Sequence, residues 1–323
     1  MAGVVWDSFE AIGQAEDVQD VIYNVSPVDN PVAAMSRTLR ATGKLHEWQE
    51  DTLRPAQSNV AVEGADAGDD QSLATVLLTN NTQIMDKVAR ITGTLEEVDK
   101  YGRDSEMAYQ LELRYGELAN DEELAIIGAP GNVRQTSTAG SVTANDPDTP
   151  GRTMACFQVQ ILSLGGANVV DADLTADLAG LESDMLDAQQ GSYDLGGNAN
   201  YLIVTPTGGR QVASFAAADG RLRDFETGKT IVNVIDMYLS PYGSLDVVLD
   251  RNAESNGNTN NDELIMAGID FQYSATPVLR ATRDYPLAKT GDADNRQIIR
   301  ESTYALLNRG SAFMVENIEP DLS

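Results

Sequence analysis

The 323-residue sequence predicts an α+β fold, and three observations lead to this class. The stretch from Asp104 to Ile127 has the periodicity of one long amphipathic helix. A long β-hairpin is predicted before this helix, and a region of alternating helices and strands is predicted after it. A chain of this length can bury a substantial core and would ordinarily form two domains.

The long helix is predicted to begin at Asp104, whose side chain can cap the first turn, just after the turn residue Gly102. Gly128 and Pro130 are the usual stop signals at its end. Apolar side chains recur at spacings of three and four and are expected to face the core: Met107, Leu111, Tyr115 and Leu118. Carboxylates are expected to point elsewhere: Glu106, Glu112 and Glu117. An ordinary core helix has the same pattern, so periodicity alone assigns no function.

Residues 43–93 are predicted to form the hairpin. Lys44–Glu50 has the composition of a strand, and a second, long strand returns from about Ala74 to Thr92. Between them lies a tip of small and polar residues from Arg54 to Asp70. Because an isolated hairpin is marginally stable in water, we infer that another subunit supports its strands.

Two other segments are poor in core-forming residues. Residues 1–42 are predicted to form an arm, in which Pro27 and Pro31 favour an extended path that lies against another part of the structure or a neighbouring molecule. The stretch between Pro130 and Gly151 is rich in Gly, Ser, Thr, Ala and Asn and is predicted to be a mobile loop.

Residues from about 154 to 286 are predicted to alternate between α and β structure. In chain order, the expected elements are a strand at Phe157–Leu164, a helix at Leu174–Gln189, a strand at Tyr201–Val204, a helix opened by Pro206, an antiparallel pair at Ile231–Leu239 and Leu245–Leu249, and a strand at Leu264–Ala267. The tail from Gln297 to Asn317 is predicted to form two closing strands around Asn308-Arg309-Gly310.

The charge balance argues against several classes of partner. Lys and Arg number 22 against 50 Asp and Glu, which gives a formal net charge of −28. Binding to nucleic acid through a basic surface needs clustered Lys and Arg, and binding to anionic lipid needs positive charge too, so neither is expected. No apolar run approaches the ~20 residues of a membrane span, and the N-terminal stretch lacks the pattern of a signal peptide.

Two partial motifs resemble ligand-binding loops and fail in detail. Gly228-Lys229-Thr230 ends like a phosphate-binding loop, yet Arg223 stands where Gly is required, and a strand rather than a helix is expected next. The loop 250–262 alternates Asp, Asn and Glu like a calcium site, but its Gly comes two places late, at Gly257, and Asn261 replaces the bidentate Glu. A turn-rich surface loop is the preferred interpretation, and whether this loop binds a cation stays open.

Catalytic residues are not predicted. His46 is the only histidine and lies on the hairpin beside Trp48, far in sequence from Cys156, the only cysteine. A Ser-His-Asp or Cys-His site is therefore not supported, and zinc lacks ligands. Cys156 is expected to be a buried, inert thiol among apolar neighbours. We predict no enzymatic activity, no cofactor, and no catalytic, cofactor-binding or metal-binding residue.

Five short runs of residues, in a fixed order along the chain, are typical of one protein family. The runs are Asp20 to Pro27, His46 to Asp51, Gly102-Arg103 with Glu106 and Ala108-Tyr109-Gln110, Glu122 to Gly128, and Glu301 to Gly310. With arm, hairpin, long helix, α/β region and closing strands in this order, the chain resembles the major capsid proteins of tailed bacteriophages with the HK97 fold. It is most similar to the SU10-type major capsid proteins, and the likeness covers nearly the whole chain.

The resemblance implies an HK97-like capsid fold with four named parts. These would be the N-terminal arm at 1–42, the extended β-hairpin or E-loop at 43–93, the peripheral P-domain at 94–153 and 276–323 with its β-sheet and spine helix 104–127, and the α/β axial A-domain at 154–275. In this family the A-domain lines the five-fold and six-fold axes of the shell.

The resemblance also implies a function. The chain would be a major capsid protein that self-assembles into pentamers and hexamers, forming the icosahedral shell around the packaged dsDNA of a tailed phage. It would be part of the virion, after assembly in the host cytoplasm, and copies would contact one another through the N-arm and E-loop. Decoration, scaffolding and portal proteins are further partners that the resemblance implies. The alternatives are another virion part, such as a tail-tube or decoration protein, and an acidic enzyme from a salt-loving organism.

Two details of the shell follow from particular residues. Some members of the fold crosslink through a lysine and an asparagine, but Lys44 and Lys87 lie on the hairpin rather than at its tip, so a noncovalent shell is expected. Asp121, Glu122 and Glu123 stand near the helix end, where negative charge is unfavourable by roughly 0.3–1 kcal/mol each at low salt. Either Asn120 and Glu123 form a capping box that restarts a second helix after a bend, or arginines of a neighbouring subunit neutralise the cluster.

Overall fold

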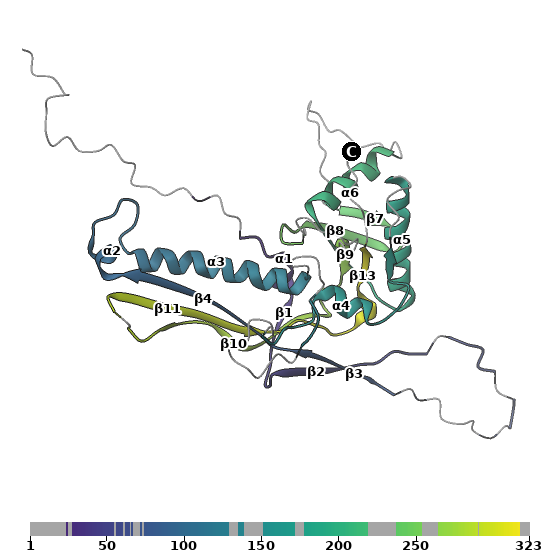
Figure 1. Cartoon of the computed structure of the whole chain (residues 1–323). Helices are drawn as coiled ribbons and strands as arrows, with labels where there is room; N and C mark the ends of the chain where they lie inside the picture. The colour runs from purple at the N-terminus through teal and green to yellow at the C-terminus, as the bar shows by residue number, and fades with distance from the viewer. Residues whose placement is uncertain are drawn as a thin grey trace, which may run out of the picture.

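The computed structural model describes residues 24, 28–54, 56–60, 62–64, 66, 72, 74–128, 135–138, 151–171, 178–218, 237–253, 264–289 and 291–316. Three parts can be followed in Figure 1: a long helix over one sheet, a second sheet flanked by helices, and a two-stranded hairpin that projects from their junction. Among the described residues, no helix combines the length and the apolar character needed to cross a membrane.

The long helix α3 spans Glu106–Ile127, close to the predicted range. Its N-cap is Ser105 rather than Asp104, because the first helical residue is Glu106 and the capping position falls one residue before it. The Oγ of Ser105 accepts a hydrogen bond from the Ala108 N–H at 3.2 Å. Gly128, with φ 74°, ends the helix in the left-handed conformation, as the sequence predicted.

Helix α3 covers one face of a five-stranded sheet (Figure 1). Its strands are β1 (Arg37–Arg40), β4 (Gln83–Thr92), β10 (Ser274–Pro286), β11 (Ala293–Ser302) and β12 (Ala305–Leu306), in the order β1-β10-β11-β4 with β12 beside β10. Strands β4 and β11 pair antiparallel along their whole lengths. Leu118 of α3 is buried against Met85 of β4 and Ile298 of β11. The short helix α2 (Gly93–Glu97) connects β4 to α3.

Two residues of α3 lie on faces that periodicity did not predict. Glu106 is only 4% exposed, because its carboxylate forms an ion pair with Arg103 and accepts a hydrogen bond from Gln110 Nε2 at 2.9 Å. Tyr115, expected in the core, is 38% exposed. A carboxylate can be buried when a nearby side chain pairs with it. The spacing of apolar residues along a helix gives no sign of such a pair.

The hairpin consists of β2 (Leu45–Glu50) and β3 (Val76–Asn81), which pair antiparallel. The prediction of one strand from Ala74 to Thr92 is wrong, because the chain breaks at Thr82 between β3 and β4. The Thr82 N–H donates to Lys44 O at 2.8 Å, which redirects the chain from the hairpin into the five-stranded sheet. Strand-forming residues run through both strands, so propensity alone does not indicate the break.

The second sheet has six strands in the order β5-β13-β9-β6-β8-β7. They are β5 (Val169–Asp171), β6 (Tyr201–Val204), β7 (Met237–Ser240), β8 (Gly243–Leu249), β9 (Leu264–Ile269) and β13 (Phe313–Glu316), and the helices beside them are α5 (Leu178–Asp194) and α6 (Pro206–Ala218). The predicted strand at β6, the helix opened by Pro206 and the β7–β8 turn are confirmed. Residues 231–236 of the predicted pair lie outside the described residues.

The segment predicted as a strand at Phe157–Leu164 is instead the helix α4 (Phe157–Leu162). Gln158 and Gln160 alternate with apolar residues, which is the pattern of a half-exposed strand. Both glutamines are buried, however, and their Nε2 atoms donate to backbone carbonyls of Ile127 and Tyr304, each at 3.1 Å. These buried amides satisfy backbone carbonyls inside the protein. The alternation of polar and apolar residues in this segment therefore does not indicate a face exposed to solvent.

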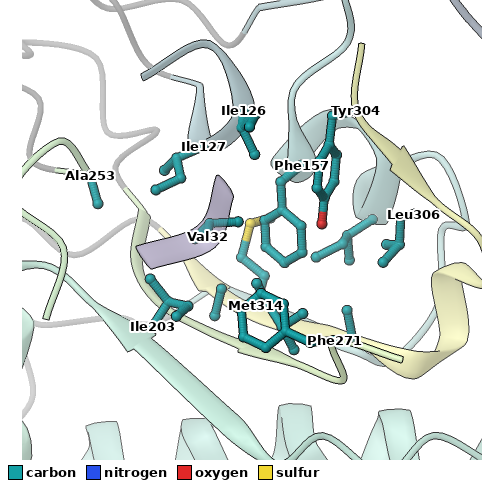
Figure 2. Packing of buried hydrophobic residues seen from close by; sticks show 14 of the residues in the cluster. Val32, Ile126, Ile127, Phe157, Ile203, Ala253, Phe271, Tyr304, Leu306 and Met314 are labelled. Atoms are coloured by element: carbon teal, nitrogen blue, oxygen red, sulfur yellow. The ribbon is translucent and has the colours of Figure 1, made fainter. Parts of the chain in front are cut away.

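One hydrophobic core joins the two sheets (Figure 2). Its side chains come from α1 (Pro31–Met35), α3, α4, the strands β6 and β9 with the residues that follow β8 and β9, and the closing segment. They include Val32, Ile126, Ile127, Phe157, Ile203, Ala253, Phe271, Tyr304, Leu306 and Met314. The two closing strands predicted around Asn308-Arg309-Gly310 exist as β12 and β13, on either side of the turn η2 (Arg309–Ser311). They do not pair with each other, because β12 lies in the five-stranded sheet and β13 in the six-stranded one.

Candidate functional site

The projecting hairpin carries apolar side chains into solvent. Among the described residues, those exposed on its strands and on the segment between them are Leu45, Leu53, Val60, Val62, Val76 and Leu77. Figure 1 shows this ribbon extending away from both sheets. Leu53 and Val60 are 98% and 89% exposed. An exposed, two-stranded ribbon with so many apolar side chains is typical of a surface that another polypeptide covers.

Glu50 and Arg309 fix the base of the hairpin. The carboxylate of Glu50, at the end of β2, accepts hydrogen bonds from Nε and Nη2 of Arg309 at 3.2 and 3.1 Å. The backbone N–H of Arg309 donates to the same carboxylate at 3.0 Å. Both side chains are buried, so a charge-assisted, bidentate pair holds β2 against the turn η2.

Trp48 and Asn80 tie the paired strands to the central core. Trp48 Nε1 donates to Leu306 O at 3.1 Å. Asn80 Nδ2 donates to Tyr304 O at 2.7 Å, and Asn80 Oδ1 accepts from the Ala155 N–H at 2.7 Å. Asn80 is completely buried, so these bonds satisfy its amide while fixing the direction in which the hairpin leaves the two sheets.

Glu301 holds the point at which the hairpin, the five-stranded sheet and the chain before α4 meet. Its carboxylate is 5% exposed and accepts from Thr82 Oγ1 at 3.0 Å and from Arg280 Nε at 2.7 Å. Arg152 forms an ion pair with the same carboxylate and also donates to Thr82 O. One buried carboxylate therefore binds the break between β3 and β4, strand β10 and the segment that leads into α4.

The face of the five-stranded sheet turned away from α3 is a second exposed surface. Val88, Gln297 and Tyr285 lie side by side on it, in β4, β11 and β10. Val88 and Tyr285 are 48% and 45% exposed, and Ile84 on the same side of β4 is 50% exposed. Arg283, two residues before Tyr285, is exposed on the same side of β10. This surface therefore combines apolar side chains with charged ones, namely Arg283 and also Asp86 of β4, whose Oδ2 accepts a hydrogen bond from Gln297 Nε2 at 2.8 Å.

The acidic end of α3 is neutralised within the chain. The helix is continuous to Ile127, so the predicted capping box and bend are wrong. Lys87 Nζ lies 2.6 Å from Asp121 Oδ2, and Arg300 Nε lies 2.7 Å from Glu122 Oε1. These cations come from β4 and β11 of the same chain, so neutralising these two carboxylates does not require arginines of a neighbouring subunit.

Glu123, the third carboxylate of the cluster, is buried and paired with a second carboxyl. It accepts hydrogen bonds from the N–H groups of Val32 and Ala33 at 2.6 and 2.8 Å. Its carboxyl also interacts with that of Asp250, which follows β8 and is 0% exposed. Burial, with the nearby Asp250 charge as a smaller cause, raises the pKa of Glu123 to about 8, and burial raises the pKa of Asp250.

The residues weighed as catalytic or ligand-binding candidates are not brought together. His46 stacks on Trp48 with ring centroids 5.8 Å apart, and partial burial lowers the pKa of its imidazole. Cys156 is buried, as predicted, and is not part of a disulfide. Within the described ranges, no group of three or more His, Cys, Asp or Glu could hold a metal ion. The phosphate-loop-like run 223–230 lies outside the described residues, and the loop 250–262 is described only to residue 253.

Sequence reasoning named no site residue and missed the buried carboxylates that organise this region, namely Glu50, Glu123 and Glu301. Each falls within a run that carries the family resemblance, and that coincidence is the signal that could have indicated them. Asp250 lies outside these runs. Its only sequence signal is its place in the calcium-like pattern of residues 250–262, which suggests cation binding rather than a buried pair of carboxyls.

Comparison with known proteins finds relatives that match most of the chain. The model of the SU10 major capsid protein family matches residues 6–319. A curated relative, the major capsid protein of Escherichia phage Phieco32, is 26% identical over 282 residues, which cover 76% of this chain and 79% of the relative.

Solved structures from phages and from a GTA particle are similar in fold. The likeness to a chain of Mycobacterium phage Bobi has a TM-score of 0.61 at 12% identity and covers 95% of this chain and 96% of that one. For Gordonia phage Cozz the TM-score is 0.60 at 13% identity, over 95% and 92% of the two chains. For the capsid of the native GTA particle it is 0.58 at 10% identity, over 97% of each chain. The predicted α+β class and HK97-like capsid fold are thereby confirmed.

Proposed function

Since the chain belongs to the SU10 major capsid protein family, we propose that its copies self-assemble into pentamers and hexamers. These would form the icosahedral shell around the packaged dsDNA of a tailed phage. The observation that carries the proposal is the family match over residues 6–319, which includes the hairpin, the long helix and both sheets. Several structural neighbours belong to capsid particles, which supports self-assembly.

The chain is proposed to divide as the HK97 fold does. The parts are the N-terminal arm at 1–42, the E-loop at 43–93, the P-domain at 94–153 with 276–323 and α3 as its spine, and the A-domain at 154–275. Three strands cross these limits. β1, within the arm range, and β4, within the E-loop range, lie in the five-stranded sheet, and β13, within the P-domain range, lies in the six-stranded one. The projecting part of the E-loop is therefore β2, β3 and the residues between them.

The E-loop of one copy is proposed to cover a neighbouring copy, on the face of the five-stranded sheet that α3 leaves open. The loop offers exposed apolar side chains such as Val60 and Leu77, and the sheet face offers Val88 and Tyr285. Burying such surface contributes about 25 cal/mol per Å². The loop also carries carboxylates, whereas Arg283 lies on the sheet face, and opposite charges of this kind set register and specificity. The carboxylates are Glu47, Asp51, Glu63 and Asp66.

A structural role in the virion is the whole of the proposed function, and no catalytic step is part of it. Assembly is proposed to take place in the host cytoplasm. Copies of the chain are its principal partners, and decoration, scaffolding and portal proteins are partners of the finished particle. Strong acidity suits an inner wall beside DNA, because such a wall gains nothing by attracting phosphate.

Electron microscopy of the purified full-length chain tests the proposal. Closed shells with five-fold vertices are expected. Open-ended tubes would instead indicate a tail-tube protein. A chain that stays monomeric alone but binds to shells made of another protein would indicate a decoration protein. Either of these two outcomes would overturn the proposal.

A further inference from the structure

Three segments that are distant in sequence meet at one pair of buried carboxyls. Glu123 stands in the last turns of α3, Asp250 directly follows β8, and the N–H groups of Val32 and Ala33 in α1 bind Glu123. Figure 2 shows the Val32 side chain in the same cluster as Ile127 of α3 and Ala253, three residues beyond Asp250. The pair therefore joins the arm, the spine helix and the six-stranded sheet.

The hydrogen bonds around Glu123 and Asp250 require that one of the two carboxyls is protonated. An ionised carboxylate only accepts hydrogen bonds, so two carboxyls can bond to each other only if one of them is protonated. Both oxygens of Glu123 accept from α1, and Asp250 Oδ1 accepts from the Asn252 N–H at 2.8 Å. Asp250 Oδ2 is buried and has no hydrogen-bond donor among the described residues. A proton placed between Asp250 Oδ2 and Glu123 satisfies this atom.

We propose that Glu123 and Asp250 hold a single proton between them and that this proton latches α1 and the segment after β8 onto the end of α3. Loss of the proton at alkaline pH leaves two negative charges in contact and opens the latch. The inference rests on the proposed function only in identifying α1 as the root of the intersubunit arm. The latch itself stands on contacts within one chain.

The surrounding groups favour retention of the proton. Asp29, just before α1, contributes further negative charge near Asp250. Arg251 lies 4.0 Å from the Asp29 carboxylate and is largely exposed, so its charge is directed to Asp29 and to solvent. Tyr304 is completely buried, and burial raises its pKa, which keeps this neighbour of Glu123 neutral. Glu122 on the preceding position is paired with Arg300.

Hydrogen exchange and infrared spectroscopy of the full-length wild-type chain test the latch directly. Between pH 6 and 9, the protection of the Val32 and Ala33 amides, corrected for the intrinsic exchange rate, is expected to fall with a midpoint near pH 8. One pH unit above the midpoint, about one pair in ten keeps its proton, so protection should drop roughly tenfold. The carbonyl band of a protonated carboxyl should be present at pH 7 and disappear over the same range.

Asp250→Asn is the decisive variant. Its amide keeps the oxygen that accepts from Asn252, and its NH₂ donates permanently to Glu123, so amide protection should become independent of pH up to pH 9 and the infrared band should vanish. Asp121→Asn, a change to an exposed carboxylate of the same helix, should leave the wild-type transition in place. A wild type without the band at pH 7, or a transition that persists unchanged in Asp250→Asn, would overturn the proposal. These readouts work on unassembled protein, so a failure to form shells is a separate result.

Discussion

The guanidinium of Arg309 and the carboxylate of Glu50, 259 positions apart, form a buried bidentate pair at the root of the E-loop. Arg309 also donates through Nη1 to Ser163 Oγ at 3.0 Å. One guanidinium thereby holds β2, the turn η2 and the residue that follows α4. The direction in which the β2–β3 hairpin leaves the two sheets depends on this pair.

Replacing Arg309 by Met is expected to lower the free energy of unfolding by about 3–5 kcal/mol, because it leaves the buried Glu50 carboxylate without its cation. Urea denaturation at pH 7 measures the loss. The double variant Glu50→Gln with Arg309→Met should recover part of it, since no buried charge then remains unpaired.

Lys289→Met is the matched control for this change. Lys289 pairs with Asp294, and both side chains are more than half exposed, so the denaturation midpoint should hardly move. Equal losses in free energy of unfolding for the Arg309 and Lys289 variants would mean that the buried Glu50–Arg309 pair stabilises the fold no more than an exposed ion pair does.

Leu77→Glu on the E-loop is expected to impair assembly while leaving the subunit folded. Leu77 is 56% exposed, so the unassembled chain loses little, but a charge at this position cannot be buried against a neighbour. Losing one apolar contact of about 1.5–3 kcal/mol corresponds to more than a tenfold loss of affinity per contact. Shell yield by sedimentation measures the effect, and Leu77→Met should assemble normally. Full yield with Leu77→Glu would exclude this residue from the interface.

Gly128→Ala is expected to destabilise the protein for two separable reasons. A left-handed residue with a Cβ costs about 1–2 kcal/mol, and a Cβ here would lie 2.1 Å from the Cys156 Cβ. Gly165→Ala provides the control, because Gly165 also has a positive φ of 64° but open space around it. Thermal denaturation should show the larger loss at Gly128. Combining Gly128→Ala with Cys156→Gly should cost less than the sum of the two single changes.

The stability of the wild type is expected to fall as pH rises from 6 to 9. The folded chain binds a proton at Glu123, with a pKa of about 8, that the unfolded chain releases near its ordinary value of 4.5. The stabilisation is therefore complete below pH 4.5 and is lost as pH rises through about 8, with a slope of up to about 1.4 kcal/mol per pH unit for one proton. The difference between wild type and Asp250→Asn in urea denaturation isolates this effect. A difference that does not vary with pH would contradict it.

Assembled shells are expected to dissociate into single chains under denaturing conditions. Residues 51–75 of the E-loop contain no lysine, and the Lys87 ammonium is engaged by Asp121. Intact-mass measurement should therefore give the monomer mass alone. A ladder of covalent multimers would show that another lysine reaches an asparagine of a neighbour.

The sequence predicted those parts of the fold whose signal is local. The helix α3 with its Gly128 terminus, the strand β6 and the Pro206 helix all follow from periodicity and from residues that begin or end a helix. The family resemblance supplied the arrangement of these parts, which no local pattern contains.

Two of the misses share a physical cause, which is burial of polar groups through distant partners. Gln158 and Gln160 made α4 resemble a half-exposed strand. The sequence does not distinguish a glutamine in solvent from a buried glutamine whose amide donates to a distant backbone carbonyl. Glu123 likewise resembled a surface acid at a helix end, although its partners lie in α1 and beyond β8. Such partners are known only when the tertiary structure is known.

The position of β13 constrains how the subunit can be made. This strand pairs with both β5 and β9 inside the six-stranded sheet, yet every other strand of that sheet precedes it in the chain. During synthesis, β5 and β9 therefore leave the ribosome with the place between them empty, and the sheet stays divided until β13 emerges. Since β12, just before it, closes the other sheet, both halves of the subunit are completed at nearly the same moment. A chain that is still being synthesised therefore has neither sheet complete and cannot yet offer a complete subunit surface to other copies.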